Sequence, residues 1–404
     1  MRILYVLNTN EPFHLYRGGG QRSFLIYKAL QELGHVDVAA IYNPDLPFTD
    51  NEDLESNLYK ISLRSFSTNN FGRLYSKSLK LINFLLGEKN FYSKNTYLEN
   101  KLDSIIRNNK YDIIFSRYLE TAILSNVLKY HNLIVDIDDL PHDQFLIKEI
   151  KLLPKFLRKK IYNNIKTQYD YLITKIPISF VSNPNQKQVS NQRILKNIPL
   201  INESENSNSR ISNIHYKKDG NNLLYIGSLD YEANYKSILY FIKHVWPIVI
   251  NKSPNLKFNI IGKGLPQYIQ EEIKKIDGIN YIGYVKDLNP YFASSSIYIS
   301  PVYYGTGTNI KILEAISKDI PIVASPMVLR GYEHFLKDGE NILIGKDDQE
   351  FANKILTLVK DQILQNKMIN QAKNDLKNEG YDFNHFKKTV QNSCFEIMGS
   401  NIKL

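Results

Sequence analysis

The sequence predicts an α/β protein built from two doubly wound parallel-sheet domains. Residues 2–42 show a strand, a glycine-rich turn, a helix and a second strand, an order that requires parallel strands joined by a right-handed crossover. Residues 201–220 interrupt this alternation, because they are polar, rich in Asn and Ser and without hydrophobic periodicity. Strands and helices then alternate again from Leu223 onwards. Since each half starts its own sheet, two domains fit better than one barrel.

The first domain is expected to form its sheet from short apolar strands. Residues 2–7 have a buried-strand pattern and lead into a loop that ends in Gly18-Gly19-Gly20. Apolar residues then recur with a period near 3.6, which indicates a helix that stops at Gly34. Further strands are predicted at residues 37–42, 112–115, 133–136 and 178–181.

The second domain repeats the same architecture. Its strands are predicted at residues 223–227, 257–261, 281–282, 297–300 and 322–324. Its helices are predicted at residues 236–250, 266–275, 309–317 and 348–376, and a polar helical tail follows at 381–400.

Composition narrows the class of protein. Lys and Arg number 51 against 41 Asp and Glu, and residues 1–200 hold 27 of the basic and 19 of the acidic side chains. The 28 Tyr, 19 Phe and single Trp are not interleaved with basic residues in a nucleic-acid-binding module, so nucleic acid is not expected as a partner. The single cysteine, Cys394, can form neither an internal disulfide nor a metal site. With no signal-peptide core at the start and no stretch of ~18 apolar residues, we expect a cytoplasmic protein.

Gly18, Gly19 and Gly20 lie between the first strand and a helix, where backbone N–H groups and the helix dipole favour an anion. The segment is not G-x-G-x-x-G, and no acidic residue ends the second strand to bind a ribose, so a dinucleotide cofactor is disfavoured. Two interpretations stay open: approach of a phosphate or substrate, or a turn that lets the helix pack closely.

Residues 300–325 form the most informative segment. A strand ends at Pro301, a Gly/Thr loop opens a helix that carries Lys311 and Glu314, and a second strand follows Pro321. The loop offers N–H groups to a diphosphate, Lys311 can add a positive charge, and Glu314 can accept from two sugar hydroxyls. Alone, the segment fits equally an ordinary helix start with a solvated lysine.

This segment resembles the signature of the retaining, nucleotide-sugar-dependent glycosyltransferases of the GT-B type, family four (glycosyl transferases group 1). The resemblance rests on residues 313–325, with an E-A-(small) element followed by P-(I/V)-V-A. Supporting matches run in the family's order through Gly18–Gly20, Gly34-His35, 181–182, 197–199, 224–227, 258–264 and 279–285.

The resemblance implies a GT-B fold, with two Rossmann-like domains facing a cleft. Residues 1–205 would bind the acceptor, residues 206–380 would bind the donor, and the tail 381–404 would pack back on the first domain. It implies transfer from a UDP- or GDP-linked sugar to a bacterial surface glycan, lipid-linked or protein acceptor, with retention and with neither metal nor cofactor. The residues expected at the donor are Gly227, Ser228, Asn234, Gly262, Tyr284, Val285, Gly305, Thr308, Asn309 and Glu314, and those expected at the reaction are Thr306, Gly307, Lys311 and His142.

The sequence departs from the family at two points. The first Glu of the family's E-x7-E element falls at Thr306, and the usual Arg and Lys that hold the diphosphate are missing from residues 227–234. A variant pattern, GTGT-x-x-K-x-x-E, fits better and assigns the phosphate charge to Lys311.

In the first domain, the strand that starts at Leu133 ends in a group of polar side chains. Asp138, Asp139 and His142 are candidates to orient acceptor or donor hydroxyls, and Arg117 is a further candidate at the end of its own strand. Carboxylates that cap the next helix are the alternative, and a divalent metal is a third reading that the resemblance disfavours.

The basic excess concentrates in residues 147–166. Ile150, Leu153, Leu157, Ile161 and Ile165 line one helical face, and lysines supply the charge. A basic amphipathic helix suits an anionic membrane surface, here the inner face of the plasma membrane, although a domain helix with solvated lysines has the same pattern.

Two other classes stay open. A sugar-nucleotide epimerase shares the GT-B fold and would convert a nucleotide sugar without an acceptor. A non-catalytic GT-B subunit of a glycosyltransferase complex is the other alternative, and the departures at Thr306 and in residues 227–234 favour it.

Overall fold

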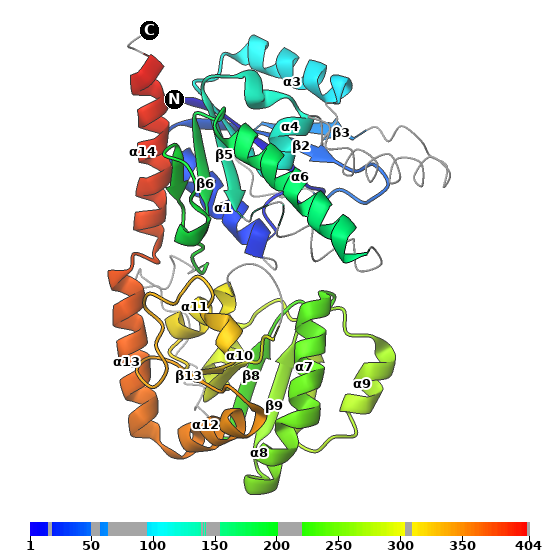
Figure 1. Cartoon of the computed structure of the whole chain (residues 1–404), viewed down its shortest axis with the longest axis vertical. Coiled ribbons are helices and arrows are strands. Elements are labelled where there is room, and N and C mark those ends of the chain that lie inside the picture. The colour runs from blue at the N-terminus through cyan, green and yellow to red at the C-terminus, as the bar shows by residue number, and fades with distance from the viewer. Residues whose placement is uncertain are drawn as a thin grey trace. The chain divides into compact units, whose positions relative to one another are not determined.

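The computed structural model divides the chain into two compact units (Figure 1). Unit 1 comprises Met1–Lys196 together with Phe383–Leu404, and unit 2 comprises Asn197–Asp382. The structure describes residues 1–14, 18–49, 57–63, 95–138, 140, 142, 154–200, 220–303 and 309–401. The expected boundary between residues 205 and 206 lies outside these described residues.

Unit 1 contains a parallel sheet whose seven strands follow the order β3-β2-β1-β4-β5-β6-β7. The central strands are almost wholly apolar and buried, as expected for a sheet covered on both faces. The strands are β1 (Arg2–Asn8), β2 (His35–Tyr42), β3 (Leu58–Ser62), β4 (Ile113–Arg117), β5 (Leu133–Asp138), β6 (Ile178–Val181) and β7 (Gln192–Ile194).

The C-terminal helix α14 packs against α1 within this unit. Lys387 Nζ lies 3.0 Å from Glu32 Oε2, and Arg193 Nη2 lies 2.8 Å from Glu396 Oε1, so a surface ion pair links each half of α14 to the rest of unit 1. The helices of unit 1 are α1 (Gly18–Gln31), α3 (Thr96–Asn109), α4 (Leu119–Leu124), α6 (Lys155–Ile173) and α14 (Phe383–Asn401), with 3₁₀ turns η1 (Val127–Lys129) and η2 (Pro184–Gln186).

Unit 2 contains a second parallel sheet, in the order β10-β9-β8-β11-β12-β13. Its strands are β8 (Asn222–Ile226), β9 (Lys257–Ile261), β10 (Ile279–Gly283), β11 (Ile297–Ser300), β12 (Ile322–Ala324) and β13 (Leu343–Ile344). Its helices are α7 (Glu232–His244), α8 (Trp246–Lys252), α9 (Gln267–Ile273), α10 (Asn289–Ser294), α11 (Ile310–Ser317), α12 (Asp348–Lys360) and α13 (Gln362–Asn378), with the 3₁₀ turn η4 (Pro326–Leu329).

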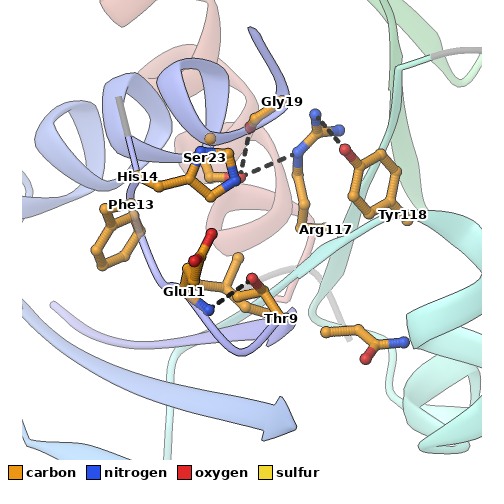
Figure 2. A pocket seen from close by; sticks show the side chains of 11 residues that line it. Thr9, Glu11, Phe13, His14, Gly19, Ser23, Arg117 and Tyr118 are labelled. Carbon is orange, nitrogen blue, oxygen red and sulfur yellow. Dashed lines mark hydrogen bonds between the residues drawn. The ribbon is translucent and has the colours of Figure 1, made fainter. Parts of the chain in front are cut away.

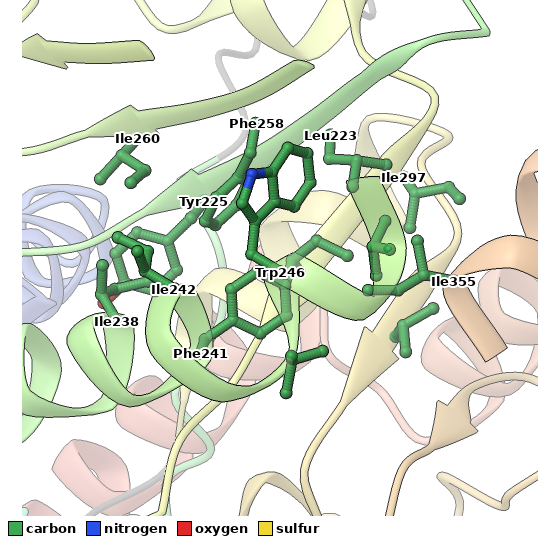
Figure 3. Packing of buried hydrophobic residues seen from close by; sticks show 14 of the residues in the cluster. Leu223, Tyr225, Ile238, Phe241, Ile242, Trp246, Phe258, Ile260, Ile297 and Ile355 are labelled. Atoms are coloured by element: carbon green, nitrogen blue, oxygen red, sulfur yellow. The ribbon is translucent and has the colours of Figure 1, made fainter. Parts of the chain in front are cut away.

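The core of unit 2 is centred on Trp246, the only tryptophan in the chain (Figure 3). Its ring packs near Phe258, which also contacts Phe241 of α7, and its indole N–H donates to the Asp277 carbonyl at 3.0 Å. The core therefore holds α7 and α8 against the sheet.

Three sequence-based expectations about helices need correction. The predicted helix 236–250 is two helices, because Pro247, which has no N–H to donate, occupies the first turn of a new helix. The predicted helix 348–376 is also two, because Asp361 ends the first and accepts from Leu364 N at 2.8 Å to cap the second. Gly18–Gly20, expected in a loop, form the first turn of α1.

Both sheets place two adjacent strands, β1 with β4 and β8 with β11, at the point where the chain order reverses. In open α/β sheets, ligands bind beyond the carboxyl ends of the strands at such a point. A ligand site is therefore expected at each of these two edges. Across the part of the chain that the structure describes, no helix is both long and apolar enough to span a membrane.

Candidate functional site

The first candidate site lies at the carboxyl edge of the unit 2 sheet, where three glycines end adjacent strands. Gly227 N donates to Ile261 O at 3.0 Å, and Gly262 N donates to Gly283 O at 2.9 Å. A Cβ at Gly262 would lie only 1.8 Å from the Gly227 carbonyl oxygen. Glycine is therefore required at Gly262, and the main chains after β8, β9 and β10 meet without side chains between them.

The predicted donor residues Ser228 and Asn234 shape the loop after β8. Ser228 Oγ donates to Asp230 Oδ1 at 2.7 Å, and Asn234 Nδ2 donates to the Ser228 carbonyl at 2.9 Å. The structure thus gives both side chains contacts within the loop. Tyr284 and Val285, predicted to border the base, directly follow β10, and the Tyr284 side chain is 56% exposed.

Lys311 and Glu314, considered separately in the sequence, form an ion pair. Lys311 Nζ lies 2.6 Å from Glu314 Oε2, and the two side chains are 19% and 15% exposed. Asn309 precedes α11 and donates from Nδ2 to Ser300 Oγ at 3.0 Å, which ties the helix start to the end of β11. The spacing of three residues between Lys311 and Glu314 on one helix is the sequence signal for their pairing.

The Glu314 carboxylate also lies near a buried tyrosine. Burial, and after it the nearby Tyr225 and Glu314, hold the pKa of Tyr298 well above its usual range. Its hydroxyl donates to the Ile226 carbonyl at 3.1 Å and so joins β11 to the end of β8. The remaining predicted residues, Gly305, Thr306, Gly307 and Thr308, lie outside the described residues.

The second candidate site is a cavity of about 320 Å³ within unit 1, at the carboxyl ends of β1 and β4 (Figure 2). The chain order reverses between these two strands. The polar residues that line the cavity include Thr9, Glu11, His14, Ser23, Arg117 and Tyr118, and Gly19 and Gly20 of α1 complete one side.

The glycines at the start of α1 allow close packing. A Cβ at Gly20 would lie 2.0 Å from the His14 carbonyl oxygen, and one at Gly19 would lie 2.8 Å from the Tyr118 hydroxyl. Of the two interpretations of Gly18–Gly20, close packing therefore has a direct structural reason. Approach of a phosphate stays a prediction.

Below the cavity, two arginines and two aspartates form a buried cluster, named here the arginine–aspartate cluster: Arg22, Arg117, Asp136 and Asp138. Arg22 donates from Nε and Nη2 to the two oxygens of Asp136, at 2.9 and 2.7 Å. Arg117 Nη1 lies 2.8 Å from Asp136 Oδ2, and Arg117 Nη2 lies 2.8 Å from Asp138 Oδ2. Only Asp138, with its side chain 14% exposed, reaches the surface, since the other three side chains are at most 1% exposed.

Burial opposes the charge on these arginines, but their partners outweigh it. Desolvation alone would lower the pKa of Arg117, whereas the Tyr118 phenol and the Asp136 and Asp138 carboxylates raise it well above its usual value. The same balance between burial and the carboxylates raises the pKa of Arg22. Both guanidinium groups are therefore charged, and each is matched by a carboxylate.

Backbone strain marks the same region. Tyr118 and Asp138 have φ angles of 67° and 62°, which side chains other than glycine rarely adopt. Tyr118 is held there by its N–H, which donates to Asp136 O at 2.7 Å, and by the Arg117 guanidinium, whose carbon lies 3.9 Å from the ring centre.

Sequence reasoning named Arg117 and Asp138 but missed Arg22, Glu11 and Tyr118. Arg22 carries a usable signal, because it lies four residues before buried Ile26 on α1 and so places a charge on an apolar face. Glu11 and Tyr118 carry no pattern that separates them from ordinary loop residues.

His142, expected beside Asp138 and Asp139 at the sheet edge, is instead 2% exposed. Its ring lies 5.2 Å from the Tyr162 ring and 5.5 Å from the Tyr169 ring, both on α6. It does not line the unit 1 cavity, and its predicted role at the reaction stays a prediction. Asp139 lies outside the described residues. Among the residues that are described, no three His, Cys, Asp or Glu side chains gather closely enough to hold a metal ion.

Two parallel sheets with the Rossmann strand order are the architecture of the GT-B fold. Residues 220–361 match the model of the glycosyl transferases group 1 family. Together with the fold, this match confirms the predicted resemblance to the GT-B glycosyltransferases of that type.

Two proteins of similar sequence and one of similar structure align with all or part of this chain. An uncharacterized 44.6 kDa protein in the cps region of Klebsiella pneumoniae is 23% identical over 383 residues, which is 89% of this chain and 92% of that one. The Campylobacter jejuni enzyme that adds N-acetyl-D-galactosamine to GalNAc-α-(1→4)-GalNAc-α-(1→3)-diNAcBac-PP-undecaprenol is 22% identical over 201 residues, covering 49% of this chain and 54% of that enzyme. The structure of Anabaena HepE in complex with UDP superposes with a TM-score of 0.64 at 11% identity, covering 98% of this chain and 100% of that one.

Proposed function

We propose that this protein transfers a sugar, with retention and without a bound metal, from a nucleotide-diphosphate sugar to a glycan, lipid-linked or protein acceptor. One observation carries the proposal. The segment that matches the glycosyl transferases group 1 family, residues 220–361, includes the glycine contacts after β8, β9 and β10 and the Lys311–Glu314 pair. The donor would bind at this edge of unit 2, and the UDP bound to Anabaena HepE favours a UDP-linked sugar.

The roles follow from the chemistry of each group. Glu314 would accept from the two ribose hydroxyls, Lys311 would neutralise the departing diphosphate, and the main chain at Tyr284 and Val285 would contact the base. Lys311 and Glu314 contact each other at 2.6 Å, so each side chain would have to bind the nucleotide while it stays paired with the other. The residues 305–308 would add N–H groups at the start of α11.

Unit 1 would bind the acceptor. The cavity at β1 and β4 supports this role, because it lies at the reversal point of its own sheet and joins hydroxyl, carboxylate and aromatic groups. The Campylobacter relative acts on a sugar chain linked to undecaprenyl diphosphate, and a membrane-held acceptor of this kind would suit a protein that works at the inner face of the plasma membrane.

The exposed face of α6 supports an anionic membrane as a partner. Phe156 and Tyr171 are 70% and 56% exposed, and they lie on the face opposite buried Ile161 and Ile165. Lys155, Lys159 and Lys160 are exposed at the same end of the helix as Phe156. Part of the predicted segment 147–166, residues 147–153, lies outside the described residues. Aromatic side chains flanked by lysines are typical of helices that lie on anionic lipid.

Sedimentation with phosphatidylglycerol vesicles tests this partner. The protein should sediment with these vesicles and not with phosphatidylcholine vesicles, and the charge reversals Lys159→Glu and Lys160→Glu should release it. Lys252→Glu in unit 2 is the matched control. Equal binding to both lipids, or no binding to either, would count against a membrane partner.

Nucleotide binding tests the donor site. UDP should raise the melting temperature of the protein more than GDP or ADP, because a ligand that binds only the native state stabilises it. Glu314→Gln should weaken UDP binding at least tenfold by calorimetry, since one of two hydrogen bonds to a charged acceptor is worth about 1.5–3 kcal/mol. Glu272→Gln, at an exposed glutamate on α9, should bind UDP like the parent.

The remaining classes give different results. Conversion of a nucleotide sugar with no acceptor present would identify an epimerase. Absence of stabilisation by any nucleoside diphosphate would favour the non-catalytic subunit. Activity that disappears with EDTA and returns with a divalent metal would contradict a metal-free reaction.

A further inference from the structure

One peptide group of unit 2, just beyond the carboxyl end of β11, is held between two buried serine side chains. The N–H of Tyr303 donates to Ser237 Oγ at 3.3 Å, and the carbonyl of Val302 accepts from Ser325 Oγ. This N–H and this carbonyl belong to the same planar trans peptide group and point in opposite directions. Ser237 and Ser325, named here the serine clamp, therefore hold the peptide group from both sides.

The two serines come from different elements of unit 2. Ser237 lies on α7 and Ser325 directly follows β12, and they are 1% and 0% exposed. Ser325 N also donates to the Ser300 carbonyl at 3.1 Å, and Asn309, where α11 begins, donates from Nδ2 to Ser300 Oγ at 3.0 Å. The chain that leaves β11 and the chain that enters α11 are thus held at the same place.

One face of α7 contacts the loops after both β8 and β11. Asn234 Nδ2 donates to the Ser228 carbonyl after β8 at 2.9 Å. One turn later Ser237 accepts from Tyr303, and the Tyr240 ring, a further turn on, lies 4.7 Å from the Tyr303 ring. Residues three apart on a helix lie on the same side of it. This side of α7 therefore links the ends of β8 and β11, the two strands between which the chain order reverses.

Core packing does not account for a serine at position 237. A buried hydroxyl must be hydrogen-bonded to offset its lost hydration, whereas alanine has no such requirement and has a higher helix propensity. Ser237 Oγ also donates to the Ala233 carbonyl at 2.6 Å, but a serine bond to the carbonyl four residues earlier does not stabilise a helix. What serine adds over alanine is the hydrogen bond from the peptide group beyond β11.

We propose that the serine clamp orders the donor edge of unit 2, so that Ser237 and Ser325 are positioning residues for the nucleotide-diphosphate sugar. The next helix after Tyr303 carries Lys311 and Glu314, and a fixed chain direction at Tyr303 limits where that helix can begin. A site that is ordered before binding loses less conformational entropy when the ligand binds, and so binds it more tightly. This inference rests on the proposed function and adds to it two residues that act through the main chain.

Hydrogen exchange of the full chain, followed by mass spectrometry, tests the clamp without a nucleotide. Ser237→Ala removes the acceptor of the Tyr303 N–H, so this amide should exchange faster in peptides that cover residues 300–303. Ser325→Ala should accelerate the same amide, although the Ser325 hydroxyl donates to the other end of the peptide group.

Ser295→Ala is the matched control. Ser295 is also buried and donates from Oγ to a carbonyl four residues earlier, that of Tyr291 at 2.7 Å, as Ser237 does to Ala233. It precedes β11 and so lies at the opposite edge of the sheet. The control should therefore leave the exchange of the Tyr303 amide as it is in the parent.

Calorimetry with UDP tests what the clamp does for the donor. Ser237→Ala and Ser325→Ala should each bind UDP at least fivefold more weakly than the parent, and Ser295→Ala should bind it within twofold of the parent. Because both hydroxyls hold one peptide group, the double variant should lose less affinity than the product of the two single losses. Melting temperatures within a few degrees of the parent establish that the variants are folded.

Three results would overturn the proposal: an unchanged Tyr303 amide in either clamp variant, parent-like UDP affinity in either one, or single losses that multiply in the double variant. Failure of UDP to bind the parent would refute the proposed function together with this role of the clamp. Equal binding of UDP by the parent and the clamp variants would refute the role of the clamp alone.

Discussion

The two units solve the same structural problem with different chemistry. Both have a parallel sheet whose chain order reverses beside the first strand. In unit 1 the edge at this point is fixed by the arginine–aspartate cluster. In unit 2 the edge beside this point, after β8, β9 and β10, is held by main-chain contacts between Gly227, Gly262 and Gly283.

The difference bears on what each edge can bind. Strand ends without side chains let a ligand approach the main chain closely. A cluster of balanced charges holds neighbouring side chains such as Tyr118 in place but adds no net charge. The comparison predicts that unit 1 depends on its charges for stability and that unit 2 depends on its glycines.

The largest effect is expected from Asp136→Asn. The substitution removes the carboxylate that pairs with both Arg22 and Arg117, so two buried guanidinium groups are left with Asp138 alone. Breaking a buried ion pair costs about 3–5 kcal/mol of unfolding free energy. Urea unfolding followed by circular dichroism should show an early loss of helix, while the fluorescence of Trp246, which lies in unit 2, changes later.

The control for this variant is Asp170→Asn, which removes an exposed i,i+4 ion pair with Lys166 and should cost at most about 0.5 kcal/mol. If circular dichroism and fluorescence shift together in Asp136→Asn, the cluster does not act within unit 1 alone.

A smaller effect, about 2–3 kcal/mol, is expected from Gly262→Ala. The new Cβ would contact the Gly227 carbonyl oxygen at 1.8 Å, so the loops after β8 and β9 must separate. Here the Trp246 fluorescence transition should move to lower urea. Gly283→Ala separates the two causes, since Gly283 has a φ of 82° but no atom near its Cβ position, and strain alone should cost about 1–2 kcal/mol. Equal losses in both variants would show that the close approach is unimportant.

The strands of both sheets can be predicted from the sequence, but the arginine–aspartate cluster and the break between α7 and α8 cannot be predicted from hydrophobic periodicity. Strands such as 2–7 and 297–300 were predicted almost to the residue, because a parallel strand buried on both faces is a short apolar run between polar turns. The break between α7 and α8 was missed although Pro247 marks it, because apolar periodicity continues across the proline.

The charged cluster could not be predicted, because its members are far apart in the chain. Arg22 and Asp136 are separated by 114 residues and meet only when α1 packs on the sheet. His142 shows that the fold can separate neighbours in sequence. It follows the acidic end of β5 in sequence, yet the chain turns it into the interior against α6. Proximity in sequence predicts a shared site only when the intervening backbone is known.

Acid should affect unit 1 through a second buried carboxylate, Asp37. Burial alone would raise the pKa of Asp37, but hydrogen bonds from Tyr111 at 2.6 Å, Asn57 at 2.8 Å and His35 lower it overall. A carboxyl with a lower pKa in the folded state stabilises above its unfolded pKa, about 3.9, and this contribution disappears as the pH falls through the folded value.

Asp37→Asn should therefore cost about 1–2 kcal/mol at pH 7 and progressively less below about pH 4. Urea midpoints of the circular dichroism transition at pH 7, 4 and 3 measure this convergence. Parallel curves for parent and variant would show that Asp37 does not titrate differently in the folded protein.

The smallest stability effect is expected from the ion pair of unit 2. Lys311→Met should cost less than about 1 kcal/mol, because the pair lies three residues apart on one helix, is partly exposed and has no counterpart to the cluster that surrounds Asp136. The Trp246 fluorescence midpoint in urea measures it, and UDP affinity measured on the same sample should fall at least tenfold. A loss of stability as large as that of Asp136→Asn would make Lys311 structural. It would also remove the contrast between the two units. In unit 1 the arginine–aspartate cluster stabilises the fold, whereas in unit 2 Lys311 and Glu314 are expected to bind a ligand and to add little stability.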